Sequence, residues 1–318
     1  MSFASFLRPV LMSLCLLTAP AHGRDRTAIL VFASYPGWDI LDQIRVPQVT
    51  MQKVDSQAEA IAAYRSGAAD MIAISHVDLL ALMADDAPSS EAVILFPTSF
   101  SNGADFIVGP SGADATNLAG QRVGVPRVTV SHYLMMRELD TFSHENERPP
   151  VMVDLDPAEI PKALKEGRID VAVMRAPAGM DLLDLPNMQR IFDSHAIERD
   201  IVDLVVMRRD RYLKETEVAE ALSRAWFDTV ENQGTSTDDG ISRHMIETAE
   251  GAARMMQTGE FMFAMLRAMD FVKVQHRALD DTTSLNPFAV RFWSGATIGD
   301  PQHVQIEVRF DHLGEGAR

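Results

Sequence analysis

The 318-residue sequence is short of basic side chains and of cysteine, and each shortage excludes a class of function. Its 29 lysine and arginine residues are outnumbered by 45 aspartate and glutamate residues, which gives a formal net charge of -16. Binding to nucleic acid or to an anionic membrane surface needs a basic face, so this balance argues against both partners. Glycine, proline and charged residues occur at ordinary frequencies, which excludes disordered and collagen-like chains. The length suits one large domain or two smaller ones with a sizeable core.

Long apolar runs are also missing, since none approaches the roughly 20 residues of a membrane-spanning helix. The most apolar stretch, residues 9–19, follows Arg8 and precedes the small residues Ala21 and Gly23. A positive charge, a short apolar stretch and small residues in this order predict a secretory signal peptide over residues 1–23. A buried N-terminal helix is the alternative interpretation.

The only cysteine, Cys15, lies inside this apolar stretch. Leu14 precedes it, where bacterial lipoprotein signals carry a small residue, so we do not expect a lipid anchor. After cleavage near Gly23 the protein would have no thiol, no disulfide and no thiolate metal site. We therefore expect a free, soluble, exported protein.

Two segments of the sequence carry the same pattern at an offset of 100 positions. Residues 49–74 and 151–174 each read as a strand, a helix start, a short helix, a glycine and a buried apolar strand. Ser56 and Asp156 are the predicted helix caps, each followed three residues later by a glutamate that can complete a capping box. The repeat predicts two similar α/β lobes, with chance similarity as the alternative. The glycines, which suit the left-handed residue after a helix, are Gly67 and Gly167.

The remaining pattern predicts how the two lobes divide the chain. Lobe one is expected to hold residues 24–108 and 204–318, and lobe two residues 109–203. Each lobe is predicted to be a mostly parallel sheet flanked by helices, and helical periodicity within residues 218–275 adds a C-terminal helical segment to lobe one. Two crossings between the lobes would form a hinge.

Polar and aromatic side chains follow the predicted strands at the ends where parallel α/β sheets bind ligands. Trp38 could stack on a planar ligand or merely cover the hinge. Asn102 and Asp105 could accept hydrogen bonds from ligand N–H groups, although an Asn-Gly pair is commonly a turn. Asp105 could instead pair with Arg127 or Arg175. The full set of candidate ligand-binding residues is Trp38, Ser75, His76, Asn102, Asp105, Thr129, Ser131, His132 and Arg175.

Two helix starts supply the other candidates. Thr129 or Ser131 could hold an anion or a carbonyl oxygen, because free N–H groups and the helix dipole point there, or could be a plain cap. His132 could donate to a ligand oxygen or pack in the cleft. Residues Ser75–Asp78 begin another helix, in which Asp78 is expected to be a cap rather than a ligand contact.

Catalytic and metal-binding motifs are absent from the sequence. It contains no HExxH, no phosphate-binding loop, no GxSxG and no metal-ligand spacing among its nine histidines. The adjacent Ser131 and His132 do not by themselves provide the geometry of a nucleophile and its base. We therefore expect a binding protein that is not an enzyme and that has no cofactor and no metal.

The order of several motifs resembles the nitrate/taurine/sulfonate group (NitT/TauT) of ABC-transporter substrate-binding proteins. These motifs span nearly all of the chain after the signal region and are Gly37-Trp38, Ser75–Asp78, Ser101–Asp105, Leu118–Val125, Ser131–Leu134 and Ala163–Asp170. Three further segments are most similar to the periplasmic binding proteins encoded beside urea carboxylases, namely Ser99–Gly103, Val130–Leu134 and Ile201–Leu204.

This resemblance implies a type II-like periplasmic binding fold whose two lobes close on a small polar ligand. The protein would be a periplasmic monomer that delivers its ligand to an ABC permease in the inner membrane. The urea-carboxylase likeness favours a urea, guanidine or amide, whereas the wider group favours a sulfonate or nitrate. A ligand-sensing module for a membrane receptor stays open as an alternative. So does an enzyme of the related thiamine-pyrimidine-synthase-like fold, although the cysteine-rich motif of those enzymes is absent.

Three departures from the group's pattern concern the ligand rather than the fold. Only a short stretch, residues 40–47, follows Trp38 and Asp39, where the group has a longer segment with an apolar pair. The residues Met174-Arg175-Ala176-Pro177 stand where the group often has Trp-Glu-Pro or Trp-Asn-Pro, so a charge would replace an aromatic wall of the pocket. Arg127 is likewise unusual in the loop before the second helix start.

Overall fold

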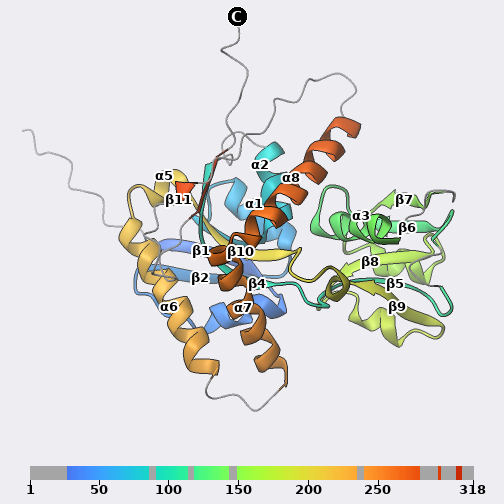
Figure 1. Ribbon diagram of the computed structural model, residues 1–318, viewed down its shortest axis with the longest axis horizontal. Coiled ribbons are helices and arrows are strands. Elements are labelled where there is room, and N and C mark those ends of the chain that lie inside the picture. The colour runs from blue at the N-terminus through green and yellow to red at the C-terminus, as the bar shows by residue number, and fades with distance from the viewer. Residues whose placement is uncertain are drawn as a thin grey trace, which may run out of the picture.

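The structure is a computed structural model that describes residues 27–85, 91–113, 118–142, 149–234, 240–279, 293–294 and 306–309. Two α/β lobes lie side by side, each built on its own sheet (Figure 1). The predicted signal peptide, residues 1–23, lies outside the described residues. Among the residues that are described, no helix is long and apolar enough to cross a membrane.

The first lobe is built on a seven-stranded sheet. Its strands are β1 (Ala28–Ala33), β2 (Val49–Val54), β3 (Met71–Ser75), β4 (Glu91–Phe100), β10 (Val202–Arg208), β11 (Trp293–Ser294) and β12 (Ile306–Arg309). They are hydrogen-bonded in the order β11-β12-β4-β10-β3-β1-β2. β1 runs parallel to β2 and β3, whereas β10 runs antiparallel to β3 and β4.

Helices pack around this sheet and supply much of the core. They are η1 (Pro36–Gln43), α1 (Gln57–Arg65), α2 (His76–Asp85), α5 (Arg209–Tyr212), α6 (Thr216–Gly234), α7 (Gly240–Thr258) and α8 (Glu260–Leu279). In the predicted apolar stripe of α6, Trp226 stacks on Phe96 of β4 with ring centroids 5.4 Å apart. α7 approaches β4 so closely that a Cβ at Gly251 would lie 2.5 Å from a ring carbon of Phe100.

The second lobe is built on a five-stranded sheet with the order β7-β6-β8-β5-β9. Its strands are β5 (Asp105–Pro110), β6 (Arg122–Val125), β7 (Val151–Asp154), β8 (Val171–Arg175) and β9 (Met188–Asp193). Its helices are α3 (Val130–Phe142), α4 (Ile160–Lys165), η3 (Met180–Asp184) and η4 (Ser194–Ile197). β6 runs parallel to β7 and β8, and β5 runs antiparallel to β8 and β9.

The predicted repeat is present as two strand–helix–strand units with one topology. β2, α1 and β3 flank β1 in the first lobe, and β7, α4 and β8 flank β6 in the second, with all of these strands parallel. An aspartate extends the repeat. Asp70 accepts a hydrogen bond from the Ile29 N–H of β1 at 3.0 Å, and Asp170 accepts one from the Arg122 N–H of β6 at 2.9 Å. Each carboxylate therefore fixes the start of its central strand.

The ends of the two short helices follow the sequence signals only in part. Gly67 and Gly167 have φ values of 76° and 67°, which confirms the left-handed helix ends. Ser56 accepts the predicted hydrogen bond from the backbone N–H three residues later, at 3.2 Å. The capping prediction for Asp156 is wrong. Its carboxylate accepts from the Ala158 N–H in a turn, and α4 begins only after that turn, beside a proline that favours the first helical positions.

The two-lobed α/β class is confirmed, but both sheets are mixed rather than mostly parallel. β5, of which residues up to 108 are predicted for lobe one, pairs wholly within the second sheet. β10 begins at Val202 and lies in the first sheet. We therefore propose that the lobes divide at residues 101–104 and 198–201. The predicted and observed lobe boundaries differ because the residues of an antiparallel strand do not indicate which strand it pairs with.

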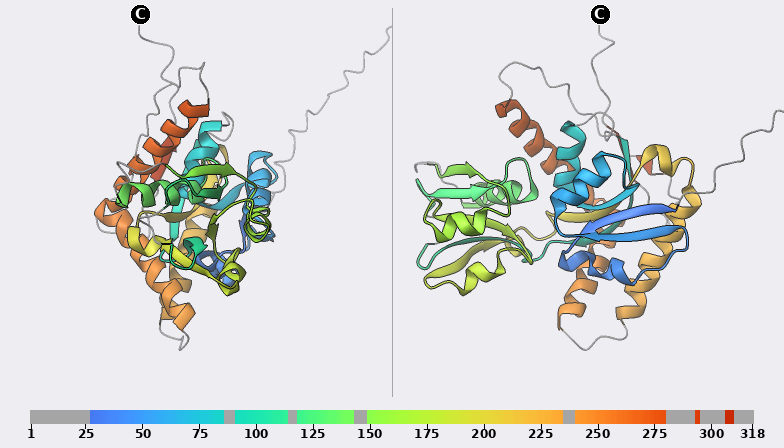
Figure 2. Two further views of the ribbon diagram at one scale, coloured as in Figure 1. Left: turned by 90° about the vertical axis from the view of Figure 1, so that its right-hand side faces the viewer. Right: turned by 180° about the vertical axis from the view of Figure 1, so that it is seen from behind.

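The two crossing segments lie against each other, as seen from behind in Figure 2. The Ser101 N–H donates to the Ile201 carbonyl at 2.8 Å, and the Ser101 hydroxyl lies 2.8 Å from that of Ser194. The apolar core also continues across the junction, since the main buried cluster of the first lobe includes Val130 and Tyr133 of α3. The lobes thus meet over polar links and over packed side chains.

Candidate ligand-binding site

Arg175 lies at the centre of a polar cluster where the two lobes meet. It ends β8 of the second lobe, and 17% of its side chain is exposed. Its guanidinium carbon lies 3.9 Å from the centre of the Tyr35 ring and 5.6 Å from that of Trp38. Both rings belong to the first lobe, so the arginine reaches across the junction and lies over an aromatic face, as in a cation–π contact.

Two buried carboxylates complete the surroundings of this guanidinium. Asp203, at the start of β10, accepts a hydrogen bond from Arg175 Nη2 at 2.5 Å and one from the Ser99 hydroxyl at 3.2 Å. Asp105, at the start of β5, has its Oδ1 3.5 Å from Arg175 Nε. Among the residues that the structure describes, neither oxygen of Asp105 receives a hydrogen bond of good geometry, although the side chain is fully buried. The sequence left Asp105 with either Arg127 or Arg175 as its partner, and the structure selects Arg175.

Burial dominates the electrostatics of the cluster. Desolvation raises the pKa of Asp203 to about 6, although the charge of Arg175 opposes the rise. The pKa of Asp105 is raised for the same reason and is likewise opposed by Arg175. Burial lowers the pKa of Arg175, but the two carboxylates outweigh it and leave that pKa well above its ordinary value. A permanent cation therefore faces two carboxylates that are costly to charge.

The turn η1 brings the two aromatic rings to the cluster. Pro36 stands at its start, where proline is favoured. Gly37 follows and packs against β4, and any Cβ there would collide with the Ser99 hydroxyl. The next residue, Trp38, is buried against Tyr35 with ring centroids 5.0 Å apart, and no described residue accepts a hydrogen bond from its indole N–H. The Gly-Trp pair thus sets the aromatic wall beside the serine that binds Asp203.

The two predicted helix starts interlock across the junction. Ser75 and Asp78 cap α2, with the Ser75 hydroxyl 2.8 Å from Asp78 Oδ2 and accepting from the Asp78 N–H at 3.0 Å. The other oxygen of Asp78 accepts from the Val130 N–H of α3 at 2.9 Å. Thr129 caps α3. Its hydroxyl accepts from the His132 N–H at 3.4 Å and donates to the Pro126 carbonyl. The backbone N–H groups of Val130 and His132, at the start of α3, therefore already have acceptors within the protein.

The two predicted histidines are both buried, and burial lowers the pKa of each to about 4. His76 accepts from the Val202 N–H at Nδ1, and its Nε2 lies 3.3 Å from the Ala264 carbonyl, so neither nitrogen is left for a ligand. His132 accepts from the Val128 N–H at 3.2 Å. Val128 has a φ of 54°, a strained value for a β-branched residue, so His132 stabilises an unusual loop.

The structure brings some predicted residues together and separates others. Trp38, Asp105 and Arg175 meet in the cluster. Ser75, Thr129 and His132 surround the interlocked helix starts, and Ser131 is buried beside them. Asn102 lies on the first crossing, where its side-chain oxygen is 2.6 Å from His195 Nδ1. Direct ligand contacts by all nine predicted residues remain predictions.

Three members of the cluster are missing from the predicted set: Tyr35, Ser99 and Asp203. Asp203 carries a signal, because it is a lone carboxylate among the apolar residues 202–207 of its strand. Buried carboxylates need a partner, which here is Arg175. Tyr35 follows β1 directly and meets the same strand-end criterion as Trp38. Ser99 carries no such signal, since only pairing of β4 with β10 brings it to Asp203.

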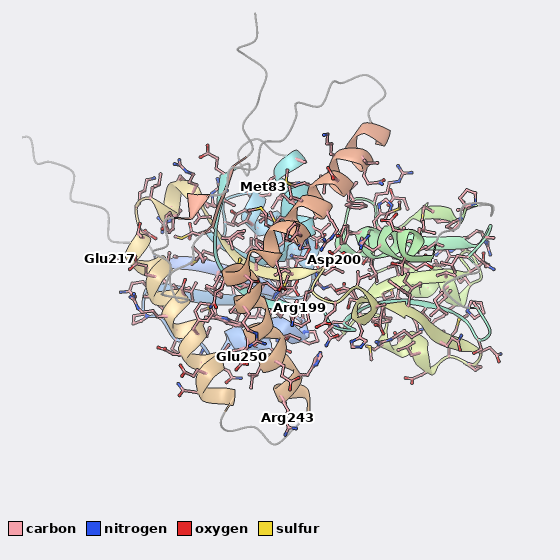
Figure 3. All side chains as sticks on the ribbon, in the orientation of Figure 1. Met83, Arg199, Asp200, Glu217, Arg243 and Glu250 are labelled. Carbon is pink, nitrogen blue, oxygen red and sulfur yellow. The ribbon has the colours of Figure 1, made fainter. Side chains whose placement is uncertain are left out.

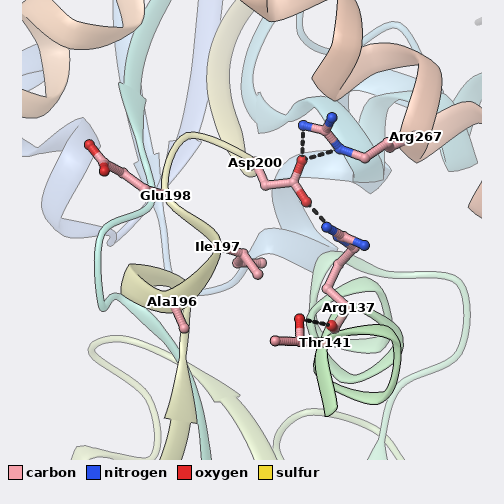
Figure 4. A pocket seen from close by; sticks show the side chains of 7 residues that line it. All are labelled: Arg137, Thr141, Ala196, Ile197, Glu198, Asp200 and Arg267. Carbon is pink, nitrogen blue, oxygen red and sulfur yellow. Dashed lines mark hydrogen bonds and ion pairs between the residues drawn. The ribbon is translucent and has the colours of Figure 1, made fainter. Parts of the chain in front are cut away.

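A second polar group links the lobes around Asp200, which lies between them (Figure 3). Asp200, on the returning crossing, is almost fully buried and accepts from Arg137 Nε of α3 at 2.6 Å and from the Tyr133 hydroxyl at 3.0 Å. Arg267 of α8 binds its other oxygen. Asp200, Arg137 and Arg267 border an open pocket of about 350 Å³ (Figure 4). We refer to Asp200 and its three partners as the Asp200 clamp.

No metal centre is evident in the part of the chain that the structure describes. Within the ranges listed above, no group of three or more histidine, cysteine, aspartate or glutamate side chains could hold a metal ion. The chemistry available in the Arg175 cluster is that of buried carboxylates, a hydroxyl, aromatic faces and a guanidinium.

Solved structures of ABC-transporter binding proteins share this fold. The alkanesulfonate-binding protein SsuA from Xanthomonas axonopodis pv. citri, bound to MOPS, matches with a TM-score of 0.53 and 14% identity over 76% of this chain and 94% of that chain. The aliphatic sulphonate-binding protein SsuA from Escherichia coli matches with a TM-score of 0.51 and 12% identity over 86% of this chain and 97% of that chain.

The periplasmic nitrate-binding protein NrtA from Synechocystis PCC 6803 also matches, with a TM-score of 0.52 and 14% identity over 73% of this chain and 65% of that chain. No family model matches the sequence, and no curated protein matches it. At such low identity, the likeness establishes the two-lobed fold of periplasmic binding proteins and nothing finer.

Proposed function

We propose that this protein is an exported solute-binding component of an ABC importer, and that it captures a small nitrogen-rich solute between its two lobes. The solute class is a urea, a guanidine or an amide. The fold shared with solved binding proteins supports the role, and so do the signal-peptide pattern and the motif order of the nitrate/taurine/sulfonate group. We include delivery to an inner-membrane permease in this proposal.

The observation that carries the solute class is the carboxylate of Asp105. It is fully buried at the first crossing between the lobes, and neither of its oxygens receives a hydrogen bond of good geometry from any residue that the structure describes. A buried acceptor without a donor costs about 1–3 kcal/mol. A ligand with planar N–H groups would supply the donors and could stack on the rings of Tyr35 or Trp38.

The charge of the junction supports the same class. The buried carboxylates of Asp105 and Asp203 pair with the guanidinium of Arg175, and that of Asp78 interacts with it electrostatically. An anion entering this cluster would meet more negative than positive charge. The start of α3, which could otherwise attract an anion, has its Val130 N–H occupied by a carboxylate.

A sulfonate or nitrate ligand is the second candidate. The solved structures that share the fold include sulfonate- and nitrate-binding proteins, and Arg175 is a cation placed at the junction. For such a ligand to bind, Arg175 would have to leave at least one of its carboxylate partners and turn its N–H groups toward the anion.

Substitution of the key carboxylate separates the two candidates. The purified mature protein is screened by thermal shift against ureas, guanidines, small amides, sulfonates and nitrate, and the affinity of any hit is then measured by calorimetry for wild type and Asp105→Asn. Loss of a buried charged partner should weaken the binding of an N–H-rich ligand by about 2–5 kcal/mol. Asp181→Asn is the matched control, because Asp181 is a largely exposed carboxylate of the same lobe. An anionic ligand that binds Asp105→Asn equally well or more tightly would overturn the nitrogen-rich assignment.

A further inference from the structure

We propose that Arg175 is a built-in occupant of the ligand site, and that its guanidinium must leave before a solute can bind. This inference rests on the proposed function in one respect, that the junction of the lobes is the solute site. It assigns Arg175 a different role from the ligand contact that the sequence predicts. The side chain competes with the solute and thereby sets the affinity and the charge that the site accepts.

The first argument is that the surroundings of the guanidinium already form a complete recognition site for a planar group rich in N–H donors. The Tyr35 ring covers one face of the guanidinium at 3.9 Å. Asp203 binds one edge at 2.5 Å and is itself held by the hydroxyl of Ser99. An aromatic face combined with carboxylates at the edge is the arrangement that favours a guanidinium over a compact cation.

The second argument concerns the direction in which Arg175 reaches. It belongs to β8 of the second lobe, whereas Tyr35, Trp38 and Asp203 belong to the first. A solute bound between two lobes holds them together by contacting both, and the Arg175 side chain already makes such contacts. It therefore holds the unliganded lobes together in place of a solute.

The third argument is that Arg175 fills this place imperfectly. Within the described part of the chain, its Nε makes no hydrogen bond and stays 3.5 Å from Asp105 Oδ1, and neither oxygen of Asp105 receives a hydrogen bond of good geometry. A solute that reaches Asp105 with its own N–H groups would gain hydrogen bonds that Arg175 does not make. Because 17% of the arginine side chain is exposed, part of the side chain that has to move already borders solvent.

The Asp200 clamp shows what a purely structural arginine looks like in this protein. Arg137 also comes from the second lobe, but its Nε makes a hydrogen bond of 2.6 Å to Asp200, and no aromatic ring covers it among the contacts of the described residues. Arg175 differs in both respects. The contrast indicates that the surroundings of Arg175 are built for a guanidinium-like group as such, rather than for an ion pair between lobes.

The test uses free guanidinium ion as the probe, at low-millimolar concentrations and with sodium chloride added to keep the ionic strength constant. Thermal unfolding is measured for wild type, Arg175→Ala and the control Arg137→Ala. We expect Arg175→Ala to be less stable than wild type, because two buried carboxylates lose their cation, and to regain stability saturably as guanidinium is added. Wild type should respond only at higher concentration. If Arg175 fills the site nine-tenths of the time, the apparent dissociation constant of guanidinium is about tenfold larger for wild type than for Arg175→Ala.

Several results would overturn the inference. The occupant role fails if guanidinium stabilises Arg175→Ala no more than sodium chloride does, or stabilises Arg137→Ala to the same extent. Arg175→Gln is the second variant, in case Arg175→Ala does not fold. If both variants stay unfolded at every guanidinium concentration, the side chain is required for folding and is not a replaceable occupant.

The inference and the proposed function fail separately. The guanidinium experiment examines Arg175 whatever solute the wild-type protein binds, whereas the Asp105→Asn comparison examines the solute class. Any solute found in the screen gives a further readout. If Arg175 is a competitor, that solute should bind Arg175→Gln more tightly than it binds wild type. If Arg175 is a direct contact, the solute should bind the variant more weakly, by about tenfold or more.

Discussion

Removal of the charge at Asp200 should destabilise the protein strongly, because this carboxylate joins both lobes and the returning crossing. It is almost fully buried and accepts hydrogen bonds from Arg137 at 2.6 Å and from the Tyr133 hydroxyl at 3.0 Å. Its third partner, Arg267, has a side chain that is 44% exposed, so solvent screening reduces what that pair contributes. The conservative change Asp200→Asn keeps the shape of the side chain and removes its charge.

The magnitude follows from these contacts. Hydrogen bonds to a charged group contribute about 1.5–3 kcal/mol each, and breaking a buried ion pair costs about 3–5 kcal/mol. The asparagine amide can still accept one of the bonds, and Arg137 can turn partly toward solvent because 26% of its side chain is exposed. We therefore expect Asp200→Asn to lower the free energy of unfolding by about 2–4 kcal/mol.

Urea denaturation of the mature protein, followed by far-ultraviolet circular dichroism near neutral pH, measures this change. Asp140→Asn is the matched control, because Asp140 pairs with the same Arg137 at 3.1 Å but is 65% exposed. An exposed pair of this kind contributes about 0–1 kcal/mol. If the two variants lose the same small amount, the clamp does not stabilise the lobe junction and the reasoning from burial is refuted.

Three further predictions concern other parts of the molecule. Burial lowers the folded-state pKa of His76 from 6.5 to about 4, so its contribution to stability is full above pH 6.5 and is lost as the pH falls toward 4. His76→Gln should flatten that part of the stability profile, and an unchanged difference between variant and wild type from pH 7 to 4.5 would contradict this. Gly37→Ala should cost about 1–3 kcal/mol in thermal unfolding, because the new methyl group meets the Ser99 hydroxyl, and a neutral result would show that η1 can shift. Intact-mass analysis of a periplasmic extract should find a chain that begins near Arg24, whereas a retained Met1 or a lipid on Cys15 would refute the export prediction.

The repeated strand–helix–strand units could be predicted from the sequence because their signals are local. Ser56 lies next to the helix that it caps, and Gly67 and Gly167 next to the helices that they end. Even here one signal misled. Asp156 has the right spacing for a capping box, but a proline in the first turn sets the start of α4 further along.

The sequence could predict which residues form the site only when those residues lie at the ends of strands. Trp38 follows a strand, Asp105 begins one and Arg175 ends one, and all three reach the cluster. His76 meets the same criterion, yet its ring is sealed by the Ala264 carbonyl, which lies 188 positions away in the chain. Asp203 faces Arg175 only because β10 inserts antiparallel between β3 and β4. Such long-range pairings leave no pattern in the neighbouring residues.

The hydrogen bond from Val130 to Asp78 makes one backbone amide a reporter of lobe separation. The first N–H groups of a helix have no partner within the helix, so this amide is protected only by a carboxylate that belongs to the other lobe. When the lobes part, the amide loses its acceptor and meets water while the rest of α3 stays folded. Its hydrogen-exchange rate should therefore count openings of the junction directly, without any attached label and without knowledge of the solute.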